Sequence, residues 1–361
     1  MRLKLERRPE ASRFWFYLSP VLAVALSALA AAGLFALLGV APGQALWLMV
    51  VTPLANVYGL AELGLKATPL LLCAVGIAVA VRANVWNIGA EGQFTMGAIA
   101  GGGIALLFGE DGGAWVLPLM LLAGVAGGLV WAAIPALLRT RCNAHEILTT
   151  LMLTYVATQL LGYLVHGPWQ DPEGYSFPQT KQFDSAALLA PLIPGTRLNL
   201  GAVFALLAVP CASVLLRQTL AGYRLRVVGL APAAASYAGF SQAGAVWLGL
   251  LVSGGLAGLA GVCEVAGPIG QLTPVISPGY GFAAIIVAFL GRLSPAGILA
   301  ASLLMALLYL GGEQLQITLQ IPTAATGVVQ GMLLFFLLAA DVLVGFRVRL
   351  IGRSVAAPAH A

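Results

Sequence analysis

Long runs of apolar residues alternate along this chain with short polar segments. The ten runs span residues 14–40, 67–81, 93–108, 114–138, 146–165, 198–216, 243–266, 282–291, 296–310 and 322–345. A helix needs roughly 20 apolar residues to cross the hydrocarbon core of a bilayer, and most of the runs approach or exceed that length. The pattern predicts an all-α polytopic membrane protein with about ten transmembrane helices.

The composition agrees with a chain that lies mostly within a membrane. Hydrophobic residues make up 60% of the 361 residues, charged residues make up 9%, and the mean hydropathy is +0.96. Soluble domains usually carry about 25% charged residues. A cleaved signal peptide is the alternative for the run at 14–40, but that run exceeds the roughly 7–15 residues of a signal core.

The basic residues fall in the short polar segments, at 1–13, 82, 139–141, 217–226, 292 and 347–353. With ten crossings, all of these positions lie on one side of the membrane, and basic loops are typically cytoplasmic. We therefore expect a cytoplasmic amino-terminal segment at 1–13, a membrane domain at 14–345 and a cytoplasmic tail at 346–361. The net charge of +5 then orients the chain and does not indicate nucleic-acid binding.

Two polar stretches, 82–93 and 267–281, interrupt the apolar pattern after the second crossing of each half. Short, glycine-interrupted helices at corresponding positions are typical of inverted repeats around a transport site. The expected halves are about 14–197 and 198–345. We expect residues 41–66 to form a helix along the outer face, and the proline-rich segment 166–197 to be an external loop.

These two stretches supply the candidate residues of a solute path. Polar groups in hydrocarbon are costly unless they line protein or water. Amides can bond to hydroxyls or base edges, and aromatic rings can stack on a ring. The candidates are Asn84, Trp86, Asn87, Glu91, Gln93, Gln271, Ser277, Tyr280 and Phe282.

Some of these residues have an alternative role. Asn87 and Glu91 would then cap and brace broken helices rather than touch solute. We expect Gly89, Gly92, Gly279 and Gly281 to supply backbone freedom rather than solute contacts.

Several catalytic patterns are missing from the sequence. It has no phosphate-binding GxxxxGK[ST] loop, no GxSxG elbow and no CxxC pair, and Thr149 stands where a zinc-binding HExxH motif would need its second histidine. We expect no catalytic residue, no metal site and no cofactor. The small-residue pairs predict closely packed helices. They are Gly97/Gly101, Gly124/Gly128, Gly254/Gly258 and Ala257/Gly261.

Four segments, at 84–94, 143–153, 222–240 and 277–291, carry a family resemblance. They resemble the membrane subunits of bacterial ABC importers for branched-chain amino acids, simple sugars and nucleosides, and look most like the nucleoside-type permeases. The resemblance covers about residues 65–345. Thr154 departs from the family, because many relatives have an asparagine there.

The resemblance implies a permease subunit in the bacterial plasma membrane that works with three partners. They are a cytoplasmic ABC ATPase, a second permease subunit that is identical or homologous, and an external solute-binding protein that faces segments 166–197 and 41–66. The missing phosphate-binding loop is consistent with energy from a separate ATPase.

By the same resemblance, residues 217–242 hold the coupling loop that docks on the ATPase. Its candidate residues are Gly222, Tyr223, Arg224, Arg226, Gly229, Ala234 and Gly239. A plain positive cytoplasmic loop is the alternative. The implied solute is a nucleoside, then a simple sugar, then a branched-chain amino acid. An ion-coupled secondary transporter and a membrane enzyme or scaffold are the other hypotheses.

Overall fold

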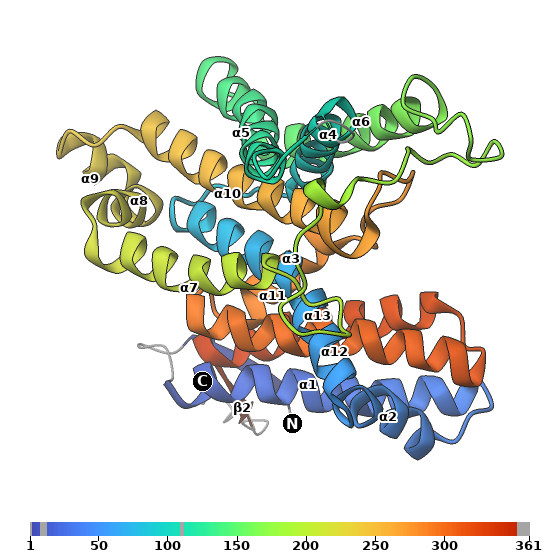
Figure 1. Ribbon diagram of the computed structural model, residues 1–361. Helices are drawn as coiled ribbons and strands as arrows, with labels where there is room; N and C mark the ends of the chain where they lie inside the picture. Colours follow the sequence, from blue (N-terminus) through green and yellow to red (C-terminus); the bar gives the residue numbers. More distant parts are fainter. Residues whose placement is uncertain (1, 8–12, 109–111, 352–361) are drawn as a thin grey trace, which may run out of the picture. The chain divides into compact units, whose positions relative to one another are not determined.

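The computed structural model describes residues 2–7, 13–108 and 112–351, and these residues are almost entirely helical (Figure 1). The chain forms two compact units. We call residues 52–311 the central unit, and residues up to 51 together with those from 312 onward the terminal unit. These units cut across the predicted halves, so the inverted-repeat division stays a prediction.

The terminal unit is built from both ends of the chain. Its helices are α1 (Arg13–Leu37), α2 (Pro42–Val50), the last turns of α12 (Pro295–Leu319) and α13 (Thr323–Gly345). α1 packs on α13, and the Ser19 hydroxyl donates to the Asp341 carboxylate at 2.9 Å.

A two-stranded antiparallel sheet joins the ends of the chain, which corrects the all-α prediction. Strand β1 (Arg2–Arg7) pairs with β2 (Phe346–Ile351). Apolar and charged residues alternate in RLKLER and in the Arg-Val-Arg-Leu of β2, which is the period of a strand. The rest of the predicted terminal segments, residues 1, 8–12 and 352–361, lie outside the described residues.

The central unit contains the remaining elements. They are η1 (Thr52–Leu54), α3 (Val57–Arg82), α4 (Ala90–Phe108), α5 (Val116–Cys142), α6 (Glu146–His166), η2 (Ser185–Ala187), α7 (Gly201–Gln218), α8 (Leu220–Leu230), α9 (Pro232–Tyr237), α10 (Gln242–Glu264), the π turn η3 (Val265–Ile269), α11 (Tyr280–Leu290) and the start of α12. Helices α3, α4 and α10 are the most buried and form its core.

Eight of the described helices are long and apolar enough to cross a membrane. These are α1, α3, α5, α6, α7, α10, α12 and α13. The two further crossings that the sequence predicts correspond to α4 and the short α11. The polytopic helical class is therefore supported, while the exact number of ten and the side of the termini stay predictions.

The predicted boundary between 41–66 and 67–81 was wrong. α3 begins ten residues earlier, where the Asn56 side chain accepts a hydrogen bond from the Gly59 amide at 2.6 Å and caps the helix. Glu62 can lie buried in the first turns because its two carboxylate oxygens accept from the Arg197 guanidinium at 2.9 and 2.6 Å. The same bonds raise the pKa of Arg197 above its ordinary range.

The run predicted to end at residue 310 is also longer in the structure, because α12 continues to Leu319. A side chain at Gly312 would collide with Thr326 of α13, so this glycine lets two helices of the terminal unit touch. Gly312 therefore serves helix packing and does not end the helix.

The predicted small-residue packing is confirmed in the core. A side chain at Gly97 of α4 would collide with Gly258 of α10, and one at Gly258 would collide with Gly124 of α5. Gly261 lies against the backbone of Phe94 in the same way. Helices α4, α5 and α10 therefore touch backbone to backbone, which only residues without a side chain allow.

We predict that Gly258→Ala lowers the stability of the purified protein by about 1–3 kcal/mol, because the added methyl group forces three helices apart. The measurement is the midpoint of thermal unfolding in detergent. Gly162→Ala on α6 is the matched control, since nothing lies within 4 Å of a side chain there. Equal midpoints for the two variants would contradict the close packing.

Candidate functional site

The first polar stretch is a turn that leads the chain back into the protein. After Arg82, the amides of Ala83 and Asn84 bond to the carbonyls of Ala80 and Val81, and Asn84 adopts a left-handed conformation with φ of 56°. Asparagine tolerates this conformation better than most residues. Residues 85–88 are then irregular, and α4 begins at Ala90.

The second polar stretch mirrors this arrangement. α10 ends in the π turn at 265–269, and an irregular segment leads to α11 at Tyr280. The Ser277 hydroxyl accepts from the amides of Gly279 and Tyr280 at 3.1 and 2.9 Å, which caps the helix. Gly279 has a φ of 94°, so this glycine supplies backbone freedom as predicted.

The amino-terminal ends of α4 and α11 meet inside the central unit. The Glu91 carboxylate accepts a hydrogen bond from the Gly281 amide at 2.6 Å, and the Ser277 side chain is a further partner. A negative charge at a helix amino terminus is favourable because unpaired amide groups point toward it. A side chain at Gly281 would collide with the backbone of Glu91, so the two helix ends touch directly.

A buried network of polar side chains lies next to this junction. The Asn87 amide donates to Gln93 at 2.7 Å and to the Ser253 hydroxyl of α10 at 2.8 Å. In return, Gln93 and the Gly89 amide donate to the Asn87 carbonyl oxygen at 3.2 and 3.1 Å. The network connects the turn, α4 and α10, so these amides brace the broken helix.

Aromatic contacts surround the junction. Trp86 stacks on Phe289 with ring centres 5.5 Å apart and an angle of 20° between the planes. Tyr280 lies edge-on to Phe94 at 6.4 Å and to Tyr309 at 5.5 Å. Trp86 and Tyr280, which are predicted for solute stacking, therefore also pack within the chain.

The structure brings Glu91, Ser277 and Tyr280 together at the junction, with Asn87 and Gln93 beside it, whereas the other predicted path residues lie apart from it. Trp86 packs on Phe289 near the far end of α11, and Gln271 bonds to Gln179. Asn87, Glu91, Gln93 and Tyr280 are buried, whereas Trp86, Gln271 and Ser277 are half-buried and Asn84 and Phe282 are exposed. The bracing alternative therefore describes the contacts of Asn87, Glu91 and Gln93, and solute contact for all nine residues stays a prediction.

Gly89, Gly92 and Gly281 do not supply the backbone freedom that was predicted for them. All three have ordinary φ angles. A side chain at Gly89 would lie 2.7 Å from the Thr150 carbonyl oxygen, and one at Gly92 would lie 2.7 Å from the Thr154 Cα of α6. These glycines allow α6 and α11 to lie against the start of α4.

The segment between α6 and α7, which contains the loop predicted at 166–197, is attached to the second polar stretch. The amides of Thr180, Phe183 and Leu189 donate to the carbonyls of Leu272, Gly270 and Ala266 at 2.8–3.0 Å. The side chain of Gln271 donates to Gln179 at 3.3 Å. The loop therefore forms a fixed surface beside one of the predicted path residues.

The predicted coupling loop contains the short helices α8 and α9. Thr219 caps α8 by accepting from the Gly222 amide at 3.1 Å, and Gly229 packs against the Arg82 carbonyl at the end of α3. Gly239, with a φ of 78°, ends the turn after α9. Tyr223 lies edge-on to Phe240 at 6.0 Å, while Ala234 is exposed.

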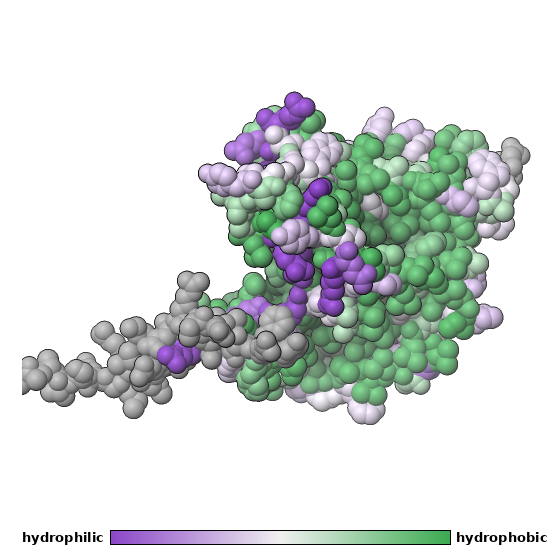
Figure 2. Space-filling model, turned by 90° about the vertical axis from the view of Figure 1, so that its left-hand side faces the viewer, coloured by the Kyte–Doolittle hydropathy of each residue, from purple (hydrophilic) through white to green (hydrophobic). Residues whose placement is uncertain are grey.

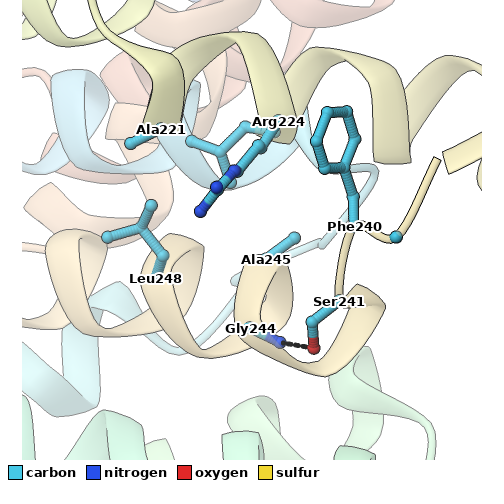
Figure 3. A pocket seen from close by; sticks show the side chains of 9 residues that line it. Ala221, Arg224, Phe240, Ser241, Gly244, Ala245 and Leu248 are labelled. Atoms are coloured by element: carbon cyan, nitrogen blue, oxygen red, sulfur yellow. Dashed lines mark hydrogen bonds between the residues drawn. The ribbon is translucent and has the colours of Figure 1, made fainter. Parts of the chain in front are cut away.

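A pocket of about 270 Å³ opens between α8 and the start of α10 (Figure 3). Arg224 reaches over the Phe240 ring at 5.6 Å from its centre. The Ser241 hydroxyl accepts from the Gly244 amide at 3.0 Å and caps α10. A second pocket, of about 660 Å³, lies between α4 and Trp169 of the segment between α6 and α7, and neither pocket includes a predicted path residue.

Several of the basic residues that were predicted to be cytoplasmic lie together at one end of the central unit. Arg82 donates to the Leu293 carbonyl at 2.9 Å, and the charges of Arg217 and Arg226 lie close enough to act on it. Trp247 at the start of α10 donates to Thr140 near Arg139 and Arg141. Figure 2 faces the side that carries α8 and α9, where hydrophilic residues gather beside a mostly hydrophobic surface.

Three residues that contact predicted path residues were not predicted from the sequence. They are Ser253, Phe289 and Tyr309. Ser253 is a lone hydroxyl next to two glycines in an apolar run, and that contrast was a usable signal. Nothing in the pattern distinguishes Phe289 or Tyr309 from other aromatic residues, because their role depends on which helices become neighbours.

Comparison with known proteins agrees with this architecture. Residues 59–338 match the family described as "Branched-chain amino acid transport system / permease component". The glucose ABC transporter permease protein TsgB13 of Haloferax volcanii is 36% identical over 359 residues, which cover 96% of this chain and 94% of the relative.

Two further relatives have names that refer to nucleosides. The guanosine ABC transporter permease protein NupP of Bacillus subtilis is 31% identical over 333 residues, with 88% of this chain and 92% of the relative covered. The nucleoside ABC transporter permease protein NupB of Lactococcus lactis is 31% identical over 277 residues, with 74% of this chain and 76% of the relative covered.

A solved ABC transporter in an inward-facing conformation has a similar fold, with a TM-score of 0.50, 17% identity, and 91% of this chain and 99% of that chain covered.

We predict that Glu91→Ala destabilises the protein by about 1–3 kcal/mol, because the buried Gly281 amide loses its acceptor. Glu91→Gln keeps an acceptor oxygen and should cost less. Thermal unfolding in detergent measures both. If the two variants unfold like the native chain, Glu91 does not hold the two helix ends together.

Proposed function

This chain belongs to the permease-component family of branched-chain amino acid transport systems, and we propose that it forms the membrane path of a nucleoside importer. It is a multi-pass membrane subunit of an ABC transporter and not an enzyme. The observation that supports a transport role best is the junction of α4 and α11, two helices that begin inside the protein.

The choice of solute rests on the relatives. Permeases named for guanosine and nucleosides match most of the chain, and the segments at 84–94 and 277–282 resemble nucleoside-type permeases. A simple sugar is the second candidate, because the permease named for glucose is 36% identical over almost the whole chain. Both solutes present ring hydroxyls, which amide and hydroxyl side chains can bind.

The partners follow from the family and from the surfaces of the central unit. A separate cytoplasmic ABC ATPase supplies the energy and docks on residues 217–242. An external solute-binding protein docks on the 166–197 loop, and a second permease subunit, identical or homologous, completes the path. In a bacterial cell the assembly lies in the plasma membrane.

The coupling role of 217–242 is supported by charge and by shape. The segment contains Arg217, Arg224 and Arg226 and no acidic residue, and it forms short helices packed on the end of α3. A plain positive loop explains the charge but not the ordered pocket beside Arg224.

We predict that the assembled transporter in liposomes accumulates guanosine when ATP is supplied to the ATPase side. Uptake of labelled guanosine and of labelled glucose, each with and without a hundredfold excess of the other, measures the preference. If glucose accumulates and guanosine does not, the solute is a simple sugar, the second candidate. Uptake that needs an ion gradient and ignores ATP would indicate a secondary transporter.

We predict that Arg224→Ala combined with Arg226→Ala lowers co-purification of the ATPase by about tenfold, since two exposed charges of the docking surface are lost. Arg141→Ala is the matched control, because Arg141 is an exposed arginine at the end of α5. If the double variant co-purifies with as much ATPase as the native chain, residues 217–242 do not dock on the ATPase, and their charge only orients the chain in the membrane.

A further inference from the structure

Helix α6 has two opposite faces with different tasks. The buried face includes Thr150 and Thr154, which lie against Gly89 and Gly92 at the start of α4. The exposed face follows helical spacing, with residues three, four or seven positions apart. Besides Thr158, it includes Leu148, Met152, Tyr155, Val156, Gln159 and Tyr163. We call these six residues the α6 stripe.

The α6 stripe differs from the exposed faces of α5, which packs on α6, and of α7. Leu122, Val130 and Leu137 of α5 are exposed, as are Leu206 and Leu207 of α7. Apolar faces of this kind suit lipid. The α6 stripe instead presents an amide and two phenol groups on a helix that is long and apolar enough to cross the membrane.

Tyr155 and Gln159 carry the argument because of their depth. Tyr155 is nine residues from Glu146 and eleven from His166, so it lies about 14 Å from the start of the helix at 1.5 Å per residue. Gln159 is one turn further along. Tyr163 lies near the helix end, where an aromatic belt at the membrane surface explains it.

Neither side chain has a hydrogen-bond partner among residues 2–7, 13–108 and 112–351. The Tyr155 side chain is 63% exposed, and the Gln159 side chain is also exposed. An amide facing lipid at this depth is costly, because hydrocarbon offers no hydrogen bond. Their surroundings must therefore include groups that can hydrogen-bond.

The neighbouring threonines do not share this property. Thr150 donates to the Glu146 carbonyl at 2.7 Å, Thr154 to Thr150 at 3.2 Å, and Thr158 to Thr154 at 3.0 Å. Their hydroxyl groups are satisfied within α6. The stripe therefore owes its unsatisfied polarity to Tyr155 and Gln159.

We propose that Tyr155 and Gln159 line the wet solute path and contact the solute's ring. The Gln159 amide bonds to ring hydroxyls, and Tyr155 offers an aromatic face and a hydroxyl. The wall of the path is then α6, while Asn87, Glu91 and Gln93 hold α4 and α11 behind it. The identity of the solute in this proposal depends on the proposed function. The presence of water along the α6 stripe does not depend on it.

Labelling of introduced cysteines tests whether water reaches the stripe. The assembled transporter first receives Cys142→Ser and Cys211→Ser, which remove the exposed native thiols and leave the buried Cys73 and Cys263. Gln159→Cys and Tyr155→Cys are then compared with Val130→Cys and Leu207→Cys, which lie on the apolar exposed faces of α5 and α7. The probe is a charged, membrane-impermeant methanethiosulfonate.

We expect labelling at positions 155 and 159 to be at least tenfold faster than at 130 and 207, because the reactive thiolate forms only in contact with water. Equally slow labelling at all four positions overturns the proposal, since the stripe then faces lipid or a dry contact with another chain. That result would not change the solute proposed for the whole transporter.

Solute protection and uptake test the contact itself. Guanosine or glucose should slow labelling of the Gln159→Cys variant, and Gln159→Ala should lower ATP-driven uptake about tenfold with unchanged ATPase association. Val130→Ala is the control and should transport normally. Fast labelling that neither solute slows keeps water on the stripe but overturns the solute contact, and uptake of another solute by the native chain would separately overturn the proposed nucleoside.

Discussion

The fold depends on satisfying the amide groups of two helices that start inside a membrane protein. Each helix start leaves four N–H groups without a partner in the helix, and hydrocarbon offers none. At α11 these groups face Ser277 and the Glu91 carboxylate, and Glu91 itself belongs to the first turn of α4. One short contact between Glu91 and Gly281 thus holds both broken helices.

That contact requires the small residues around it. Gly281 lets α11 touch α4, and Gly89 and Gly92 let α6 approach the same helix end from another side. The Asn87–Gln93–Ser253 network attaches the junction to α10. A rigid, fully bonded centre of this kind suits a transporter whose moving and binding surfaces lie elsewhere.

The surfaces with unsatisfied polarity or charge lie outside this centre. Arg224 and its pocket lie on the end of the central unit that gathers basic residues, and Tyr155 and Gln159 lie on the exposed face of α6. On the segment between α6 and α7, Arg197 is bonded to Glu62, which attaches this segment to α3. The proposed sites of ATPase docking, solute passage and solute delivery then lie on separate elements around one buried frame.

The sequence by itself determined the membrane class, the orientation signals, the family and the glycine-mediated packing, because hydropathy, basic loops and small-residue spacing are local properties. It also indicated that 82–93 and 267–281 are special, since polar residues in apolar surroundings need a partner. It misplaced the start of α3, because a charged residue such as Glu62 favours a helix on the outer face over a crossing, whereas in the structure Arg197, 135 positions away, bonds to Glu62. Tertiary structure alone decided that Asn87 and Gln93 bond to each other and that Gln159 faces outward, because burial depends on which helices become neighbours.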